Sequence, residues 1–224
     1  MSEDEISQKV EEITENKADE NEQVTALILA MIEFSEERFE KVISKAILKF
    51  GFERTVEEII YPFFRKIGVM WQTGSINPIQ EHFISNLVRQ KVIVAIDNLI
   101  PNKISNPKTF VLFLPNNELH ELSLLYYYYK IKLRGHRVIY LGQSVPFEDL
   151  ETTFHSNNPD FMLTIFTHEM KDLNLQEYIN RMSRSFHGSQ SLVSGFQLMK
   201  RKITYPRNIT LFREPSDLNS YIES

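Results

Sequence analysis

Three ionisable side chains in one short turn are the first candidates for chemistry in this sequence. The segment PNNELHELSL carries Glu118, His120 and Glu121, and it follows a continuous apolar run at residues 110–114. Such a run is typical of a strand buried on both faces, and ligands of open α/β sheets bind beyond the carboxyl ends of the strands. A histidine beside two carboxylates can serve as a metal ligand or a general base. By position alone, an ordinary surface loop is the better interpretation.

A second candidate cluster belongs to the first hundred residues. Trp71 is the only tryptophan and ends a predicted helix, whereas Glu81 and His82 lie in the first turn of the next one. A helix–loop–helix connection puts both ends on the same side, so the three side chains should cluster and could line a ligand pocket. Taken alone, a tryptophan that closes the core, with Glu81 near a helix N-terminus, is the better interpretation.

The elements that carry this second cluster are predicted to be helical. Apolar residues recur at helical spacing over residues 22–100, which predicts a four-helix bundle. Pro62 should kink the third helix. The predicted boundaries are Ser35 and Gly51 for the second helix, a Thr55–Glu58 capping box at the start of the third, and Asn77, Pro78 and Gln80 at the start of the fourth.

The pattern changes after a linker at residues 101–108. Short apolar runs then alternate with helical segments at the spacing of βαβ units, which predicts a doubly wound parallel sheet of the Rossmann or flavodoxin-like kind over residues 108–224. The expected strands are 110–114, 138–141, 161–166, 192–193 and 209–212, and the expected helices are 119–134, 147–154, 173–182 and one from 217.

Composition excludes several functions. The chain has 224 residues and a net charge of -5, without the basic character that is usual in DNA-binding domains. It lacks cysteine, so disulfides, thiolate metal sites and cysteine nucleophiles are excluded. The longest apolar run, 26–32, is too short for a membrane span, and the acidic N-terminus lacks the form of a signal peptide. We therefore expect a cytoplasmic protein without a membrane partner.

Two signatures give the chain a resemblance to a known family. The first, YPFFRKIGVMWQTGSINPIQEHF, has a W-x9-E-H spacing; the second is FLPNNELHELSLLYYYYKIKLRGHRVIYLGQSVP. Together they resemble the cobalamin-binding region of MerR-type transcription regulators, including the light-sensing carotenoid regulators, and more distantly the corrinoid module of methionine synthase. The second signature is similar to the family's D/E-x-H-x-x-G loop and its strand ending in Leu-Gly. The resemblance covers about residues 22–215, with the bundle as a cap on the cofactor.

The resemblance implies roles for the candidate residues. His120 would replace the cofactor's own benzimidazole as the lower axial ligand of cobalt, and Glu118 would orient the imidazole through its other nitrogen. Trp71 would cover the upper axial group, with Glu81 and His82 around it. Cobalamin would be bound as the adenosyl or the methyl form.

Four further positions correspond to the family's binding region for the nucleotide tail. Thr164 stands where the family often has serine, and Ser194 and Gly195 stand at its Gly-Gly pair. Ser123 replaces the glycine of the His loop, so Ser123 and Ser194 add bulk where the tail approaches the backbone. The light-sensing regulators have a histidine directly after the tryptophan, where this chain has Gln72. A photochemical step that needs a second histidine on cobalt is therefore not supported.

The resemblance implies a non-enzymatic sensor that binds cobalamin and changes its assembly as a homo-oligomer, either a dimer or a tetramer. The regulators bind DNA through an N-terminal winged-helix domain that this chain lacks, and residues 1–21 resemble the linker helix after that domain, so we expect a sensor fragment. One alternative is a methyl carrier of a corrinoid methyltransferase system, which shares the bundle, sheet and His loop. The other is an oligomerisation domain that no longer binds cobalamin.

Overall fold

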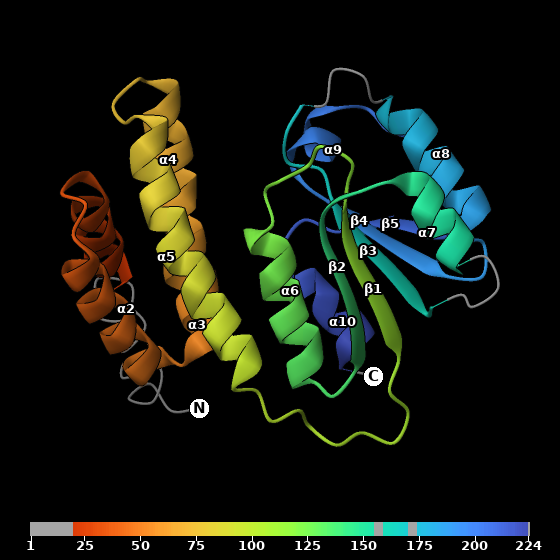
Figure 1. Cartoon of the computed structure of the whole chain (residues 1–224), viewed down its shortest axis with the longest axis horizontal. Helices are drawn as coiled ribbons and strands as arrows, with labels where there is room; N and C mark the ends of the chain where they lie inside the picture. Colours follow the sequence, from red (N-terminus) through yellow and green to blue (C-terminus); the bar gives the residue numbers. More distant parts are fainter. Residues whose placement is uncertain (1–19, 155–158, 170–173, 224) are drawn as a thin grey trace, which may run out of the picture. The chain divides into compact units, whose positions relative to one another are not determined.

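The computed structural model describes residues 20–154, 159–169 and 174–223. They form two compact units, divided between Lys91 and Val92. The first unit is helical and the second contains a five-stranded parallel sheet with helices, which confirms the predicted fold class (Figure 1). Most of the acidic leader, predicted as a linker helix, lies outside the described residues. Among the described residues, no helix is both long enough and apolar enough to cross a bilayer.

The helical unit consists of antiparallel helices joined by short turns. Ser35 begins the second helix as predicted, because its hydroxyl accepts a hydrogen bond from the backbone N–H of Arg38. Gly51 ends it in a left-handed conformation with φ of +80°. The helical segments are residues 20–32, α2 (Glu36–Phe50), α3 (Phe52–Thr55), the π-helical segment η1 (Val56–Ile60), α4 (Tyr61–Gln72) and α5 (Pro78–Asp97).

The third helix begins earlier than predicted. Its first residue is Phe52, directly after Gly51, so the expected capping box at Thr55 is wrong. The Thr55 hydroxyl instead donates a hydrogen bond to the Gly51 carbonyl one turn back, and Glu58 pairs with Arg54. The left-handed glycine turns the chain so sharply that a new helix starts without a polar linker.

Pro62 is accommodated by a widened turn. Proline lacks the N–H that would bond four residues back, and its ring crowds that carbonyl. The segment before it, η1, is π-helical, and the N–H of Tyr61 donates to the carbonyl of Val56, five residues back. A π-turn of this kind is a common site of helix distortion. Where the sequence predicted a kink at Pro62, the structure has a π-helical segment directly before it.

The fourth helix starts as predicted. The Asn77 side chain accepts hydrogen bonds from the N–H groups of Ile79 and Gln80, and the Gln80 side chain accepts one from the Asn77 N–H. This reciprocal pairing satisfies the donors that a helix start leaves open, and Pro78 needs none. The α4–α5 turn is therefore short and well defined.

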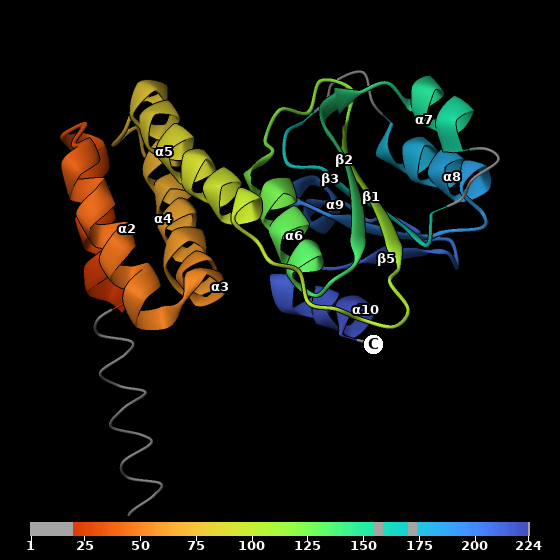
Figure 2. The same cartoon turned by 60° about the horizontal axis from the view of Figure 1, so that its bottom comes forward.

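The second unit is a parallel sheet with strand order β2-β1-β3-β4-β5. Helices α6 and α10 cover one face and helices α7 and α8 the other (Figures 1 and 2). All five predicted strands are present, and α9 is a short helix that the sequence did not predict. The elements are β1 (Thr109–Pro115), α6 (Leu122–Leu133), β2 (Arg137–Val145), α7 (Phe147–Phe154), β3 (Phe161–Ile165), α8 (Leu175–Ser185), β4 (Gln190–Ser194), α9 (Phe196–Lys200), β5 (Ile209–Leu211), the 3-10 segment η2 (Pro215–Leu218) and α10 (Asn219–Ile222).

The central strand β1 is buried on both faces, as its apolar run predicted. Val111 and Phe113 pack into the cluster formed with α7 and α8, and the alternate side chains face the other layer. At the opposite end of the strand from the candidate loop, buried His136 accepts a hydrogen bond from the N–H of Lys108 and bonds the Ile222 carbonyl. This histidine ties the last helix to the sheet and has a structural role.

Candidate functional site

The candidate loop lies where the path of the chain across the sheet reverses. The connection from β1 to β2 runs over one face through α6, and the connection from β2 to β3 runs over the other through α7. Because β1 and β3 are neighbours, the topological switch point of the sheet lies between them, at the carboxyl edge. Ligands of open α/β sheets bind at this switch point. Glu118 and His120 follow β1, and Thr167 and His168 follow β3.

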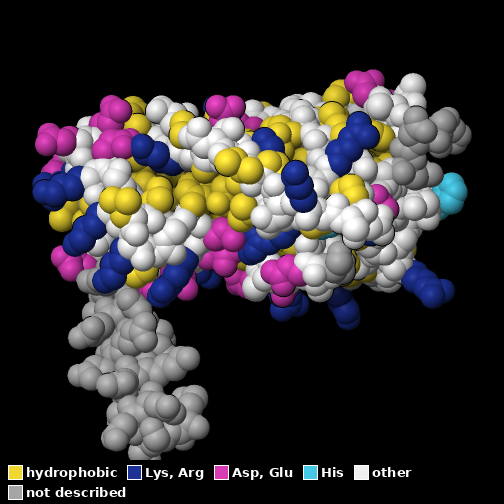
Figure 3. Space-filling view, turned by 90° about the horizontal axis from the view of Figure 1, so that it is seen from below, with side chains coloured by type: hydrophobic (Ala, Val, Ile, Leu, Met, Phe, Trp, Pro, Cys, Tyr) yellow, Lys and Arg dark blue, Asp and Glu magenta, His cyan; other side chains and the backbone are white. Residues whose placement is uncertain are grey.

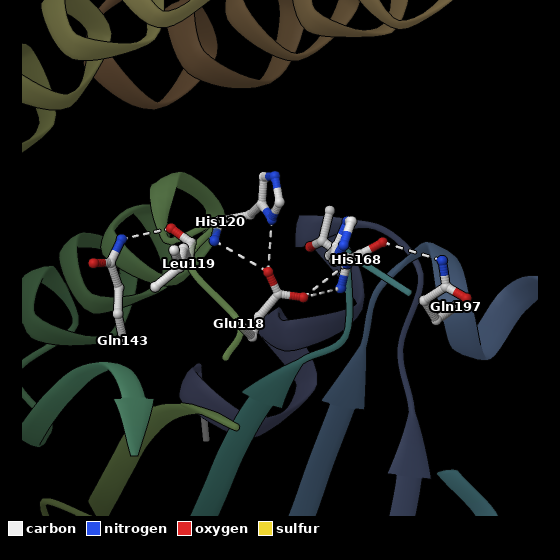
Figure 4. A network of polar contacts seen from close by, with 7 residues as sticks. Glu118, Leu119, His120, Gln143, His168 and Gln197 are labelled. Carbon is white, nitrogen blue, oxygen red and sulfur yellow. Dashed lines mark hydrogen bonds and ion pairs between the residues drawn. The ribbon is translucent and has the colours of Figure 1, made fainter. Parts of the chain in front are cut away.

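Glu118 joins the two loops at this edge (Figure 4). Its side chain is completely buried. One carboxylate oxygen accepts the N–H groups of Thr167 and His168, both at 2.8 Å. The other oxygen lies 2.7 Å from Nδ1 of His120 and accepts the His120 backbone N–H at 3.1 Å. Four hydrogen bonds therefore fix the carboxylate in place.

These hydrogen bonds determine the charge of Glu118. Burial alone would raise the pKa of the carboxyl group, because it penalises the charged form. The imidazole of His120 and the backbone N–H groups of His168, His120 and Thr167 outweigh burial, and they lower the pKa of Glu118 from its ordinary value of 4.5 to about 2. The group is therefore an anion at neutral pH, at the centre of the site.

His120 is oriented by Glu118 and remains accessible. Its side chain is 57% exposed and projects from the carboxyl edge, above the buried carboxylate (Figure 4). A carboxylate bonded to Nδ1 selects the tautomer with its proton on that nitrogen, so the lone pair lies on Nε2. The neighbouring Glu121 is buried and accepts a hydrogen bond from the Tyr140 hydroxyl at 2.9 Å, which ties the start of α6 to β2.

His168 is a member of the site that the sequence did not reveal. Its backbone N–H donates a hydrogen bond to the Glu118 carboxylate, and its ring stacks on that of His120. The ring centroids are 5.9 Å apart and the planes differ by 28°. The available signal was its place just beyond the third predicted strand, at the same edge as the His120 loop.

The loop after β3 is itself supported by the start of α9. The Gln197 side chain donates a hydrogen bond to the Thr167 carbonyl, and its N–H donates to the Phe166 carbonyl (Figure 4). Gly195 has a φ of +114°, and a Cβ atom there would lie 2.3 Å from the Phe166 carbonyl oxygen. Only glycine permits this approach. Gly195 therefore sets the position of the two N–H groups that bind Glu118.

The other residues expected near a nucleotide tail are spread over three elements. Thr164 is buried in β3, and its hydroxyl has no hydrogen-bond partner among the described residues. Ser194 is buried at the end of β4, where its carbonyl accepts the N–H of Phe166. Ser123 is partly exposed in the first turn of α6. Their contact with a tail stays a prediction.

The helical unit brings its three candidate residues to one end. Trp71 lies in the last turn of α4, and Glu81 and His82 lie in the first turn and a half of α5, across the short connecting loop (Figure 1). Trp71 is 61% exposed, so it does not close a core. Nδ1 of His82 lies 3.2 Å from the Glu81 carboxylate. That Trp71 covers the upper axial group, with Glu81 and His82 around it, stays a prediction.

The fold of this chain is similar to that of a solved corrinoid protein. Among solved structures, the monomethylamine corrinoid protein of Methanosarcina barkeri matches with a TM-score of 0.71 at 11% identity, over 90% of this chain and 97% of that one. The family model described as B12 binding domain matches residues 23–95, in the helical part.

A curated relative extends the similarity beyond the helical part. The HTH-type transcriptional repressor CarH of Myxococcus xanthus is 27% identical over 137 residues, which are 61% of this chain and 45% of the relative. The chain thus spans less than half of the relative's length. These findings confirm the resemblance to B12-binding regions that the two sequence signatures indicated.

Proposed function

We propose that this chain is the cobalamin-binding sensor region of a MerR-family transcriptional regulator, with His120 as the lower axial ligand of cobalt. The observation that carries the proposal is the hydrogen bond between buried Glu118 and Nδ1 of His120, at the switch point of the sheet. Carboxylate–histidine pairs of this kind hold metal-ligating imidazoles in one orientation and raise their basicity.

The site offers a single imidazole nitrogen, which suits a metal ion that is already coordinated by other ligands. In the described part of the chain, no group of three or more His, Asp or Glu side chains is arranged to hold an ion. A single oriented imidazole can complete the coordination of a metal held in a macrocycle, whereas it binds a free ion weakly. When bound, cobalamin would supply the cobalt and a labile carbon–cobalt bond.

The residues of this chain would contribute binding and orientation. Glu118 holds the proton on Nδ1, so that Nε2 of His120 is the ligating atom. The buried hydroxyl of Thr164 requires a polar partner, and a nucleotide tail that enters beside β3 would provide one. Ser123, Ser194 and Gly195 would adjoin that tail.

The upper face would be covered by the helical unit. Trp71 would shield an adenosyl or methyl group, with Glu81 and His82 beside it. The exposure of Trp71 and the match of the B12 binding domain model to residues 23–95 support this assignment. An exposed tryptophan is otherwise unfavourable in water, because it leaves a large apolar surface solvated.

The regulatory role rests on the similarity to a transcriptional repressor. We infer a non-enzymatic protein that works in the cytoplasm, forms a dimer or tetramer, and reaches DNA through a helix-turn-helix domain outside this chain. Exposed apolar side chains in the helical unit, such as Leu48, Val69 and Ile79, support assembly. Figure 3 shows apolar side chains exposed among charged ones over this unit.

The decisive test is an absorbance spectrum of the purified chain with adenosylcobalamin, in the dark and after illumination. Displacement of benzimidazole by His120 should give a base-off, His-on spectrum. Sedimentation velocity on the same samples should show an assembly state that depends on the cofactor. A monomer that binds cobalamin and only accepts methyl groups from a partner enzyme would instead support the methyl-carrier alternative. Absence of binding would overturn the proposal.

A further inference from the structure

Strand β2 is irregular where it passes the His120 loop. Its register against β1 shifts twice near the carboxyl end, because Phe113 pairs with Gly142 and Pro115 pairs with Val145. The edge strand thus contains more residues than its neighbour over this stretch. Bulges of this kind turn side chains away from their regular direction and are frequent beside functional sites. Here the extra length brings Gln143 and Ser144 onto the loop after β1.

Ser144 makes three hydrogen bonds to this loop. Its N–H donates to the Glu118 carbonyl at 3.2 Å, and its hydroxyl accepts the Asn117 N–H at 3.1 Å. The same hydroxyl donates to the Asn116 side-chain oxygen at 3.0 Å. Ser144 and Asn117 both have left-handed backbones, with φ of +51° and +66°. Such conformations cost free energy in residues with a side chain, so the surrounding hydrogen bonds must hold them in place.

Gln143 holds the next residue of the loop. Its side-chain amide donates a hydrogen bond to the Leu119 carbonyl, directly before His120 (Figure 4). The Leu119 side chain is 60% exposed, so little apolar packing fixes this part of the chain. The residues on either side of Glu118 are therefore held mainly by polar contacts from β2, while the Glu118 carboxylate is held by the loop after β3.

We propose that Gln143 and Ser144 are positioning residues, which hold the Glu118–His120 pair in its ligating orientation before cobalamin binds. The proposal rests on the function proposed above for His120. They act through the backbone of the loop, at Glu118 and Leu119. Preorganisation of this kind strengthens binding because the ordering of the loop is no longer a cost of binding.

The first experiment needs no cofactor. Amide hydrogen exchange is measured at Asn117, Glu118 and His120 in the wild type and in the variants Gln143→Ala and Ser144→Ala. We expect exchange at these amides to become roughly tenfold faster or more, because each variant removes hydrogen bonds that hold the loop. Unchanged exchange would overturn the proposal whether or not the chain binds cobalamin.

Matched controls are available in the same unit. Gln176→Ala removes a glutamine amide that donates to the Thr204 carbonyl, and Ser183→Ala removes a hydroxyl that donates to the Asn208 side chain. Both side chains make the same types of bond as Gln143 and Ser144, but between α8 and the segment around β5. Exchange in the His120 loop should be the same in these controls as in the wild type.

The second experiment measures how the same substitutions affect cobalamin binding. Cobalamin is titrated into each variant, and both the affinity and the His-on fraction are read from the absorbance spectrum. We expect Gln143→Ala and Ser144→Ala to bind roughly two- to tenfold more weakly, with a smaller His-on fraction, while the controls match the wild type. Ser144→Gly removes the hydroxyl together with Cβ but leaves the left-handed backbone easily accessible, so its His-on fraction should also fall.

The outcomes separate the two proposals. If the wild type does not bind cobalamin, the proposed function fails, and the exchange data alone decide whether Gln143 and Ser144 hold the loop. If the wild type binds with a His-on spectrum and both variants match it in affinity and His-on fraction, the positioning role fails and the proposed function stands. Gln143→Glu retains the size but lacks the donor, so wild-type behaviour in that variant would contradict the role of the Leu119 hydrogen bond.

Discussion

Nδ1 of His120 lies 2.7 Å from the Glu118 carboxylate, and the two side chains differ widely in exposure, with 57% for His120 and 0% for Glu118. The carboxylate is fully buried among backbone N–H groups, whereas the imidazole is more than half exposed. A buried anion thus fixes the tautomer and direction of an accessible base. A metal-ligating histidine needs this arrangement, because its unprotonated ring nitrogen must already point toward the metal when the metal binds.

Replacement of His120 by alanine should abolish the base-off, His-on spectrum and weaken cobalamin binding by at least about tenfold, as expected for the loss of one coordinating partner. The fold should survive, because an exposed loop side chain contributes little packing, and the free energy of unfolding should change by no more than about 1–2 kcal/mol. Absorbance titration and urea unfolding measure the two effects. His187→Ala is the control, since His187 is exposed and lies beyond α8. A His-on spectrum in the His120→Ala protein would rule out this ligand.

Replacement of Trp71 by alanine should leave the His-on spectrum intact and disturb only the upper face. The expected result is faster loss of the adenosyl group in light, or weaker preference for adenosylcobalamin over hydroxocobalamin, by a few-fold. Val69→Ala is a matched control, because Val69 has the same 61% exposure on the same helix. If both variants bind and photolyse alike, Trp71 does not cover the cofactor.

Replacement of Glu118 by glutamine tests the buried anion with little change in shape. The amide group would bring its own N–H donors toward the backbone N–H groups of Thr167 and His168 or toward His120. The free energy of unfolding should fall by about 2–4 kcal/mol, because buried donors lose a charged acceptor. Urea unfolding measures this, with exposed Glu148→Gln as the control. A change below about 1 kcal/mol would show that the four hydrogen bonds contribute little.

The same residue predicts a dependence of stability on pH. Folding lowers the pKa of Glu118 from 4.5 to about 2. The ionised carboxylate therefore contributes fully to the free energy of unfolding above pH 4.5, and this contribution is lost as the pH falls toward 2. Between these pH values, the free energy of unfolding should fall more steeply in the wild type than in Glu118→Gln, by up to about 1.4 kcal/mol per pH unit. Urea unfolding of both proteins between pH 5 and the acid limit of the folded state measures the difference. Parallel curves would contradict the low pKa.

Much of the fold could be predicted because apolar spacing reports burial. The run at residues 110–114 predicted the central strand, since only a strand covered on both faces lacks alternation. The Thr55 prediction failed because a capping motif is local, whereas the helix start was determined by the left-handed turn at Gly51. Helix α9 was missed because its five residues are too few for a helical period.

The candidate site was only half predictable for a topological reason. Glu118 and His120 are neighbours in sequence, so their spacing revealed them. His168 and Ser144 lie beside them because β3 and β2 flank β1 in the sheet. The order of strands in a sheet cannot be deduced from a local sequence pattern. Once the strand order is known, residues just beyond neighbouring strands become candidates without further information.

Replacement of Gly195 by alanine should destabilise the sheet unit and also disturb the ligand site. The new Cβ atom would lie 2.3 Å from the Phe166 carbonyl oxygen and 2.6 Å from the Phe166 nitrogen, and the φ of +114° is unfavourable for alanine. Relief requires a shift of the backbone that leads into Thr167 and His168. We expect the free energy of unfolding to fall by about 3 kcal/mol or more, and the His-on fraction of bound cobalamin to fall with it, because Glu118 loses its N–H donors.

Gly68→Ala is the matched control for this change. Gly68 lies inside α4, and apart from the backbone of its own helix and its chain neighbours nothing is within 4 Å of an added Cβ. Alanine in a helix interior is favoured over glycine by about 0.5–1 kcal/mol. The control should therefore be slightly more stable than the wild type and keep its spectrum. Urea unfolding and absorbance titration compare the two variants. If Gly195→Ala lowers stability but leaves the His-on fraction unchanged, the loop after β3 does not transmit its position to His120 through Glu118.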